Sequence, residues 1–252
     1  MIEPLLLAVT HVTTMLGQTR LTNATGFFFE RDDRLFLVTN GHVVLDEAGD
    51  HRPDRLEIKL HVDPDNVAAT IQFSIPLYQE GKSVWRQGSD SAGTVDVVAL
   101  ELDRSALPET FLFQAFTPAH LVKQLDQIEV GTPVLIVGFP LGFHDTLHHL
   151  PVARQAVIAS AFGIRFQGKG YFLTDARMHR GTSGAPVVVR VTKQRAGRED
   201  LAYMLLGVHA IRLDTTNRDV EQDESLGLNC AWYADILLTL TQDDAAAEPF
   251  KR

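Results

Sequence analysis

The stretch Met178–Val189 reads MHRGTSGAPVVV and joins a glycine-rich turn to the start of an apolar strand. Ser183 lies between Gly181 and Gly184, and three valines follow from position 187. Glycine loses more backbone entropy on folding than other residues, so two glycines around one serine require a reason. A tight turn whose N–H groups converge beside a serine, with no Cβ atoms in the way, suits a nucleophile that attacks a carbonyl carbon.

A serine nucleophile needs a base that takes its proton and a carboxylate that orients that base. His42 stands out among the ten histidines because it follows LFLVTNG, an apolar segment that predicts a strand. Asp96 lies between valines in TVDVVALEL, and a carboxylate in such an apolar run requires a partner. The sequence therefore predicts a triad of His42, Asp96 and Ser183. An α/β-hydrolase would have glycine where this chain has Ala185.

Short β-rich segments separated by turn residues recur along the chain and predict an all-β fold. Residues 25–40 predict a hairpin, because two apolar runs flank the polar sequence RDDR. The apolar run at residues 5–9 predicts a further strand, and residues 120–125 predict one helical turn in a connector. The leucines at 237, 238 and 240 predict a short C-terminal helix.

Composition narrows the class of protein. The 252 residues carry a net charge of −9, which argues against a non-specific nucleic-acid binder. The single cysteine, Cys230, excludes an intrachain disulfide, and the N-terminus lacks the cationic region of a signal peptide. We therefore expect a cytoplasmic protein with neither a nucleic-acid nor a membrane partner. The sequence leaves the oligomeric state open.

Three segments in this order, TNGHVV, VDVVAL and GTSGAPVV, resemble the signature segments of the chymotrypsin-like (trypsin-like) serine peptidases. The similarity is greatest to the disulfide-free bacterial branch that includes the high-temperature-requirement peptidases, here without a PDZ domain. The resemblance implies two six-stranded antiparallel β-barrels of the chymotrypsin type with a short C-terminal helix. The first barrel would span about residues 1–115 and the second about 116–235, with the helix and a tail at 236–252.

The resemblance also implies roles for the site residues. His42 would act as general base and then as general acid, and Asp96 would fix its tautomer. The backbone N–H groups of Gly181 and Ser183 would form the oxyanion hole. The implied activity is a serine endopeptidase that cleaves polypeptides through an acyl-enzyme and needs no cofactor. Thr182 replaces the aspartate of digestive relatives, which implies activity without zymogen cleavage. The alternative is a catalytically idle fold that binds peptides through its cleft.

The resemblance points to two alternative specificity pockets. His209 falls where glutamyl endopeptidases carry a histidine that contacts an acidic P1 side chain, and Arg177 falls at the base of the trypsin pocket. Either cation would favour an acidic P1 residue. Alternatively, the long side chain of Arg212 closes the pocket and leaves room for small apolar residues. The predicted substrate-binding residues are Arg177, Met178, His209, Ala210, Ile211 and Arg212.

The segment FHDTLHHLP at residues 143–151 is rich in histidine. His144 and His148 are four residues apart, a spacing that would chelate zinc on a helix. Because Gly142 and Pro151 bracket the segment, we expect a loop and no metal. Histidines in a loop near the cleft would make activity sensitive to pH.

Overall fold

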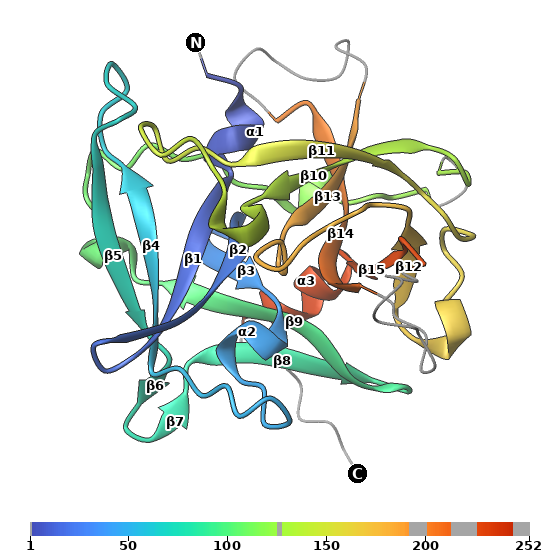
Figure 1. The fold of residues 1–252 in the computed structure, drawn as a ribbon, viewed down its shortest axis with the longest axis horizontal. Helices are drawn as coiled ribbons and strands as arrows, with labels where there is room; N and C mark the ends of the chain where they lie inside the picture. The colour runs from blue at the N-terminus through green and yellow to red at the C-terminus, as the bar shows by residue number, and fades with distance from the viewer. Residues whose placement is uncertain (1, 125–127, 192–200, 213–225, 244–252) are drawn as a thin grey trace, which may run out of the picture.

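A computed structural model describes residues 2–124, 128–191, 201–212 and 226–243, with the backbone alone at 211 and 212. Most of the regular structure lies in two curled antiparallel sheets (Figure 1). The chymotrypsin-type fold with a short C-terminal helix is confirmed. Within the described ranges the first sheet has seven strands instead of the expected six, and the second sheet has six.

The first sheet has the strand order β5-β4-β1-β2-β3-β9-β8. The single-turn helix α1 (Pro4–Leu7) precedes β1, and the single-turn helix α2 (Gly41–Val44) follows β3. A small hairpin of β6 (Tyr78–Gln79) and β7 (Lys82–Ser83) lies outside the sheet. The strands of the first sheet are β1 (Val9–Leu16), β2 (Thr19–Arg31), β3 (Arg34–Thr39), β4 (Arg55–His61), β5 (Thr70–Pro76), β8 (Trp85–Asp90) and β9 (Gly93–Leu102).

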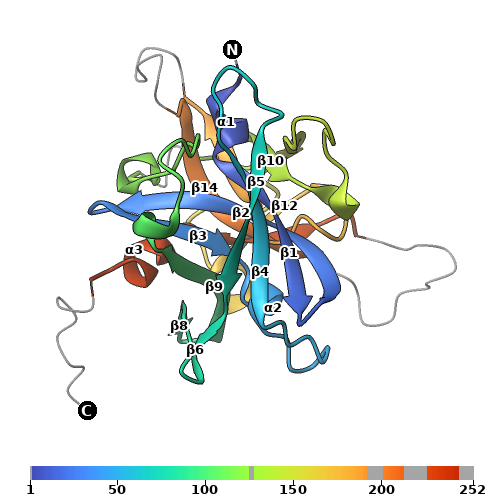
Figure 2. The same cartoon turned by 90° about the vertical axis from the view of Figure 1, so that its left-hand side faces the viewer.

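The second sheet has the strand order β11-β10-β13-β14-β15-β12. Helix α3 (Ile236–Leu240) follows its last strand and packs beside β8 and β9 of the first sheet (Figure 2). The strands are β10 (Pro133–Gly138), β11 (Val152–Val157), β12 (Tyr171–Thr174), β13 (Pro186–Arg190), β14 (Tyr203–Arg212) and β15 (Asn229–Tyr233). The 3-10 turns are η1 (Arg104–Ala106), η2 (Pro118–His120), η4 (Pro140–Gly142) and η5 (Phe166–Gly168).

The three phenylalanines at 27–29 connect the two halves of the core. Phe28 faces the interior of the first sheet, where it packs with Leu37 and Leu100. Phe27 and Phe29 point to the opposite face of β2, toward a core shared with Val188 and Val208 of the second sheet. Because β2 is buried on both faces at residues 27–29, all three positions are apolar. The two sheets therefore pack against one another through β2.

Local predictions were partly right. The hairpin at residues 25–40 is confirmed, and its turn residues Asp32 and Asp33 both have positive φ. The strand expected from residue 5 onward is present but starts later than predicted, because Pro4 begins a helical turn and β1 starts at Val9. Proline suits the first position of a helix, where its missing N–H costs nothing. The connector's helical turn lies at Pro118–His120, before the expected residues 120–125.

Candidate active site

His42 and Asp96 are joined by two hydrogen bonds. The Nδ1 atom of His42 lies 2.8 Å from Oδ2 of Asp96, and the backbone N–H of His42 donates to Oδ1 at 2.9 Å. This proximity follows from the sheet, because Thr39 at the end of β3 pairs with Val98 on β9. Asn40 adds a hydrogen bond of 2.7 Å from Nδ2 to the carbonyl of Asp96. A carboxylate at Nδ1 selects the tautomer whose Nε2 accepts a proton.

The Ser183 turn is attached to β2, the strand next to β3. The N–H of Thr25 on β2 donates to the carbonyl of Ser183 at 2.9 Å. Thr39 lies three residues before His42, and its hydroxyl donates to the carbonyl of Thr25 at 2.8 Å. Gly184 has φ +86°, and a Cβ there would lie less than 3.0 Å from Thr25 O and Thr39 Oγ1. The glycine is therefore needed to seat Ser183 against the end of β3.

The Ser183 hydroxyl is half-buried. It makes no hydrogen bond within the described residues, so the structure joins Asp96 to His42 and places the serine turn beside them. Hydrogen bonds between nucleophile and base are often long in proteins without substrate and shorten when substrate binds. The Asp96–His42 pair and the serine turn therefore have the arrangement that a triad without substrate would have.

The turn before Ser183 presents two unused N–H groups. Gly181 has φ +93°, and its carbonyl accepts a 2.8 Å hydrogen bond from the Thr25 hydroxyl. The carbonyl of Arg180 accepts from the N–H of Leu141. Since the C=O and N–H of a trans peptide point in opposite directions, the Gly181 N–H points away from Leu141. Within the described ranges, the N–H groups of Gly181 and Ser183 donate no hydrogen bond. Two free donors beside a serine suit a negatively charged oxygen.

His209 lies beneath the serine turn. Its carbonyl accepts from the N–H of Gly184 at 2.9 Å, and its N–H donates to Ala185 at 2.8 Å. Only 2% of His209 is exposed, and Nδ1 has no hydrogen-bond partner within the described residues. Burial, assisted by the nearby His42, lowers the pKa of His209 to about 4. His209 is therefore neutral at pH 7 and supplies no positive charge to a bound carboxylate.

The other predicted substrate-binding residues are spread between surface and core. Arg177 is exposed, whereas Met178 is buried in the core of the second sheet. Ala210 is buried beside Cys230. Ile211 and Arg212 continue β14, but their side chains lie outside the described part of the chain. Neither the acidic nor the small apolar pocket is tested by this arrangement, and both stay predictions.

Sequence reasoning missed Thr25, which connects the two halves of the site. Its hydroxyl donates to Gly181 and accepts the N–H of Phe139 at 3.1 Å, while its backbone binds Ser183 and Thr39. These partners lie on both sheets and far along the chain. No pattern around Thr25 reports contacts at such separation, so only the structure identifies this residue.

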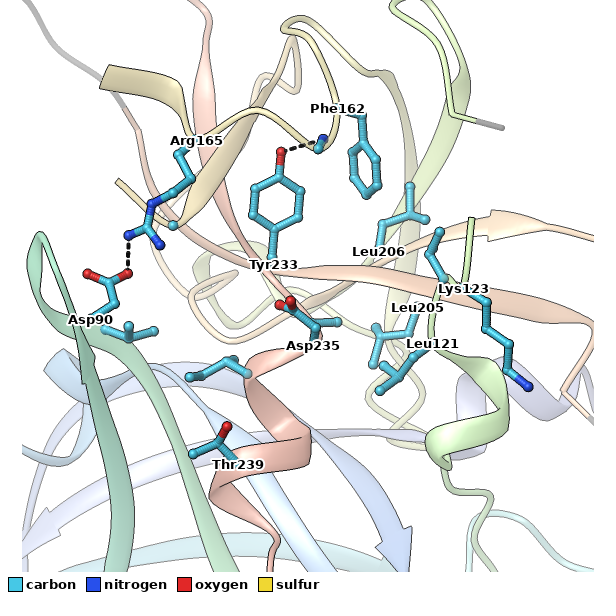
Figure 3. A pocket seen from close by; sticks show the side chains of 16 residues that line it. Asp90, Leu121, Lys123, Phe162, Arg165, Leu205, Leu206, Tyr233, Asp235 and Thr239 are labelled. Carbon is cyan, nitrogen blue, oxygen red and sulfur yellow. Dashed lines mark hydrogen bonds and ion pairs between the residues drawn. The ribbon is translucent and has the colours of Figure 1, made fainter. Parts of the chain in front are cut away.

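A separate hollow of about 520 Å³ lies between the two sheets (Figure 3). Val95, Leu205 and Leu206 form part of its apolar wall, and an ion pair of Asp90 with Arg165 crosses its edge. The Tyr233 hydroxyl accepts the N–H of Gly163 at 2.8 Å on another side. The hollow contains none of the three predicted triad residues, although Val95 directly precedes Asp96.

The fold and the site define a class of protein, the chymotrypsin-type peptidases. The trypsin-like peptidase domain family matches residues 24–194, more than half of the chain, and the chain belongs to this family. Peptidases of this family act on polypeptides. A search of curated protein sequences gave no match. No helix in the described ranges is long and apolar enough to cross a membrane.

Solved structures similar to this chain include two serine proteases and an inactivated protease paralogue. The serine endoprotease from Yersinia pestis is 17% identical, with a TM-score of 0.52 over 93% of this chain, which spans 61% of that protein. A scabies mite inactivated protease paralogue is 15% identical, with a TM-score of 0.57 and coverage of 95% and 94%. The thermostable serine protease AL20 from an extremophilic microorganism is 11% identical, with a TM-score of 0.50 and coverage of 90% and 91%. At such identities these similarities establish the fold alone.

Proposed function

We propose that this protein is a serine endopeptidase that cleaves polypeptides with His42, Asp96 and Ser183. The observation that carries the proposal is the double hydrogen bond of Asp96 to His42, with the serine turn attached through Thr25 to β2, the strand next to β3. A turn that only reversed the chain direction would not require a carboxylate to orient a histidine beside it. It would also not require two N–H groups left without partners.

The proposed reaction proceeds through an acyl-enzyme. Nε2 of His42 takes the proton of Ser183 as Oγ attacks the scissile carbonyl carbon. The N–H groups of Gly181 and Ser183 donate to the oxygen that becomes negative, and Asp96 stabilises the imidazolium. His42 then gives its proton to the leaving amine. Water hydrolyses the acyl-enzyme by the reverse sequence of proton transfers.

We also propose that the enzyme is active without zymogen cleavage. Thr182 is buried, and its hydroxyl donates to the carbonyl of His179 at 2.6 Å. The carbonyl of Thr182 accepts the N–H of Ala185 at 2.9 Å. These local bonds hold the turn around the serine, so a charged partner from a newly cut N-terminus is not needed. The cytoplasmic location favoured by the single cysteine stays a prediction.

The test is hydrolysis of peptide esters and amides by the wild type and by Ser183→Ala. The variant removes one half-buried hydroxyl and disturbs no core contact, so it should fold normally and lose turnover. Unchanged turnover in a folded Ser183→Ala protein would contradict the proposed nucleophile.

The alternative is a catalytically idle fold that binds peptides in its cleft. One structural neighbour is an inactivated protease paralogue, so this fold occurs in both forms. The free donors at Gly181 and Ser183 favour the active form, because an idle protein has no use for an oxyanion hole. Peptide binding without any turnover by the wild type would favour the idle alternative.

A further inference from the structure

A second cavity, of about 530 Å³, lies between the first sheet and the loop that follows η4. Strands β1, β2 and β4 form its floor, and residues of the 140–149 region form its other wall. The loop is fixed to β4, since His61 Nε2 lies 2.8 Å from the carbonyl of His148. The cavity is therefore a formed feature that contains none of the proposed triad residues.

Three histidine rings are in contact along this cavity, His11 from β1 and His144 and His149 from the loop. His11 and His144 stack, with ring centroids 5.5 Å apart and an interplanar angle of 22°. His149 packs at a tilt 5.7 Å from His144, and Phe139 packs against both His11 and His144. Nζ of Lys59 lies 3.0 Å from Nε2 of His149. A lysine ammonium has no acceptor, so it donates, and His149 is neutral with Nε2 as the acceptor.

The positive charges of the cavity lack acidic partners. Within the described ranges, the ammonium group of Lys59 bonds to His149 alone, and the guanidinium group of Arg20 bonds to the amide oxygen of Asn23. The one carboxylate in the cavity lining, Glu57, is 3.0 Å from Arg55 and also accepts from Gln72.

His11 experiences this excess of positive charge. Burial, which has the largest effect, and the charges of His144, Arg20 and Lys59 together lower the pKa of His11 to about 4. Its Nε2 atom is buried and has no hydrogen-bond partner within the described residues. A site with unpaired cations and an unused ring nitrogen is complementary to a negative ligand.

We propose that this cavity binds an oxyanion, that is, a carboxylate or phosphate group. Lys59 and Arg20 would donate charge-assisted hydrogen bonds to it, and the negative charge would favour protonation of the histidines around it. A metal ion fits less well, because the Lys59 ammonium already donates a hydrogen bond to the Nε2 lone pair of His149. No group of three metal-binding side chains in the described ranges has the arrangement of a metal site.

The anion site adjoins the loop that supports the serine turn. Leu141 and Gly142 line the cavity, and the N–H of Leu141 donates to the carbonyl that precedes Gly181. An anion held there therefore contacts the segment that orients the proposed oxyanion donors. The bound anion is either a carboxylate that belongs to the leaving-group side of a substrate or a free anion from solution. This connection rests on the proposed peptidase function, whereas anion binding does not.

Binding is tested with inorganic phosphate on the full-length protein, followed by NMR of the histidine ring protons. We expect saturable shifts of the signals of His11, His144 and His149. Loss of one charge-assisted donor in Lys59→Gln or Arg20→Gln should weaken binding by about tenfold or more. The exposed Lys82→Gln, which makes the same charge change outside the cavity, should bind as the wild type. Thermal melting checks that all variants fold.

Two results would overturn the anion site. One is the absence of saturable shifts, and the other is equal phosphate affinity in Lys59→Gln and Lys82→Gln. Because neither measurement involves hydrolysis, failure of the proposed peptidase activity leaves this test intact.

The source of the anion is tested with two peptide substrates that differ only by Glu or Gln on the leaving-group side. If the substrate supplies the carboxylate, the Glu peptide has the lower KM and phosphate competes with it. If a free anion is the ligand, phosphate changes kcat/KM equally for both peptides. Hydrolysis with no Glu preference and no phosphate effect would overturn the connection to the active site.

Discussion

Asp96 uses both carboxylate oxygens on His42, one for the ring and one for the backbone N–H. Asp96→Asn keeps the shape but replaces one acceptor with an NH₂ donor, which favours the wrong histidine tautomer. We expect kcat/KM to fall about 10⁴-fold with little change in folding. Asp103→Asn is the matched control, because Asp103 caps η1 at the surface. Full activity in Asp96→Asn would contradict its role.

Gly184 allows a residue-scale test of how the serine turn is seated. Ala at this position places Cβ less than 3.0 Å from the backbone of Thr25, in addition to the strain of φ +86°. Gly81 has φ +76° but nothing within 4 Å, so Gly81→Ala measures the strain alone. We expect Gly81→Ala to cost about 1–2 kcal/mol of the unfolding free energy, and Gly184→Ala to cost clearly more. Equal costs in urea unfolding would contradict the close approach.

At the scale of elements, the Thr25 hydroxyl joins β2 to the turn before the serine. Thr25→Val leaves the carbonyl of Gly181 and the N–H of Phe139 without their partner in a fully buried place. Thr14→Val on β1 removes a buried hydroxyl that bonds to Thr22, away from the site. Both variants should lose about 1–3 kcal/mol in stability.

The two threonine variants should differ in activity. Only Thr25→Val should lower kcat, because it releases the carbonyl that fixes the Gly181 peptide. Peptide ester hydrolysis at a temperature where both variants are folded measures the difference. Equal kcat values for Thr25→Val and Thr14→Val would show that the Thr25 bond contributes to stability alone.

Elements whose cause is local could be predicted from the sequence. Asp32 and Asp33 tolerate the positive φ of a tight turn, so the β2–β3 hairpin followed from two residues. The start of β1 could not be predicted, because an apolar run of five residues suits a helical turn and a strand equally. Ser183 could be predicted because two glycines, Gly181 and Gly184, surround it directly before an apolar strand. Thr25 could not, since its hydroxyl partners lie 114 and 156 residues away.

Across the whole molecule, the partly buried His11 and the buried His209 connect stability to pH. Burial lowers the pKa values of His11 and His209 from 6.5 to about 4. Between these values the unfolded chain binds protons that the folded chain does not. The stability from neutral burial is therefore complete above pH 6.5 and decreases as pH falls toward 4. The charges of the residues near His11 that were named above also lower the pKa of His11, and His42 also lowers the pKa of His209.

Urea unfolding at pH 7.5, 6.0 and 5.0 tests this dependence. The unfolding free energy of the wild type should decrease as pH falls, and that of His11→Gln should decrease less steeply because one titrating group is gone. His179→Gln removes an exposed histidine and should keep the wild-type slope. A wild-type free energy that is constant between pH 7.5 and 5.0 would contradict the neutral burial of these rings.

The central claim is that the two sheets together activate Ser183, and covalent labelling tests it most directly. A fluorophosphonate reacts with a serine whose proton is taken by a base and whose oxyanion is stabilised. We predict modification of the wild type at one site, in the peptide that contains Ser183. Labelling should be absent in Ser183→Ala and much slower in His42→Ala, with mass spectrometry as the readout. A folded wild-type protein that stays unlabelled, or that is labelled at another serine, would contradict the account.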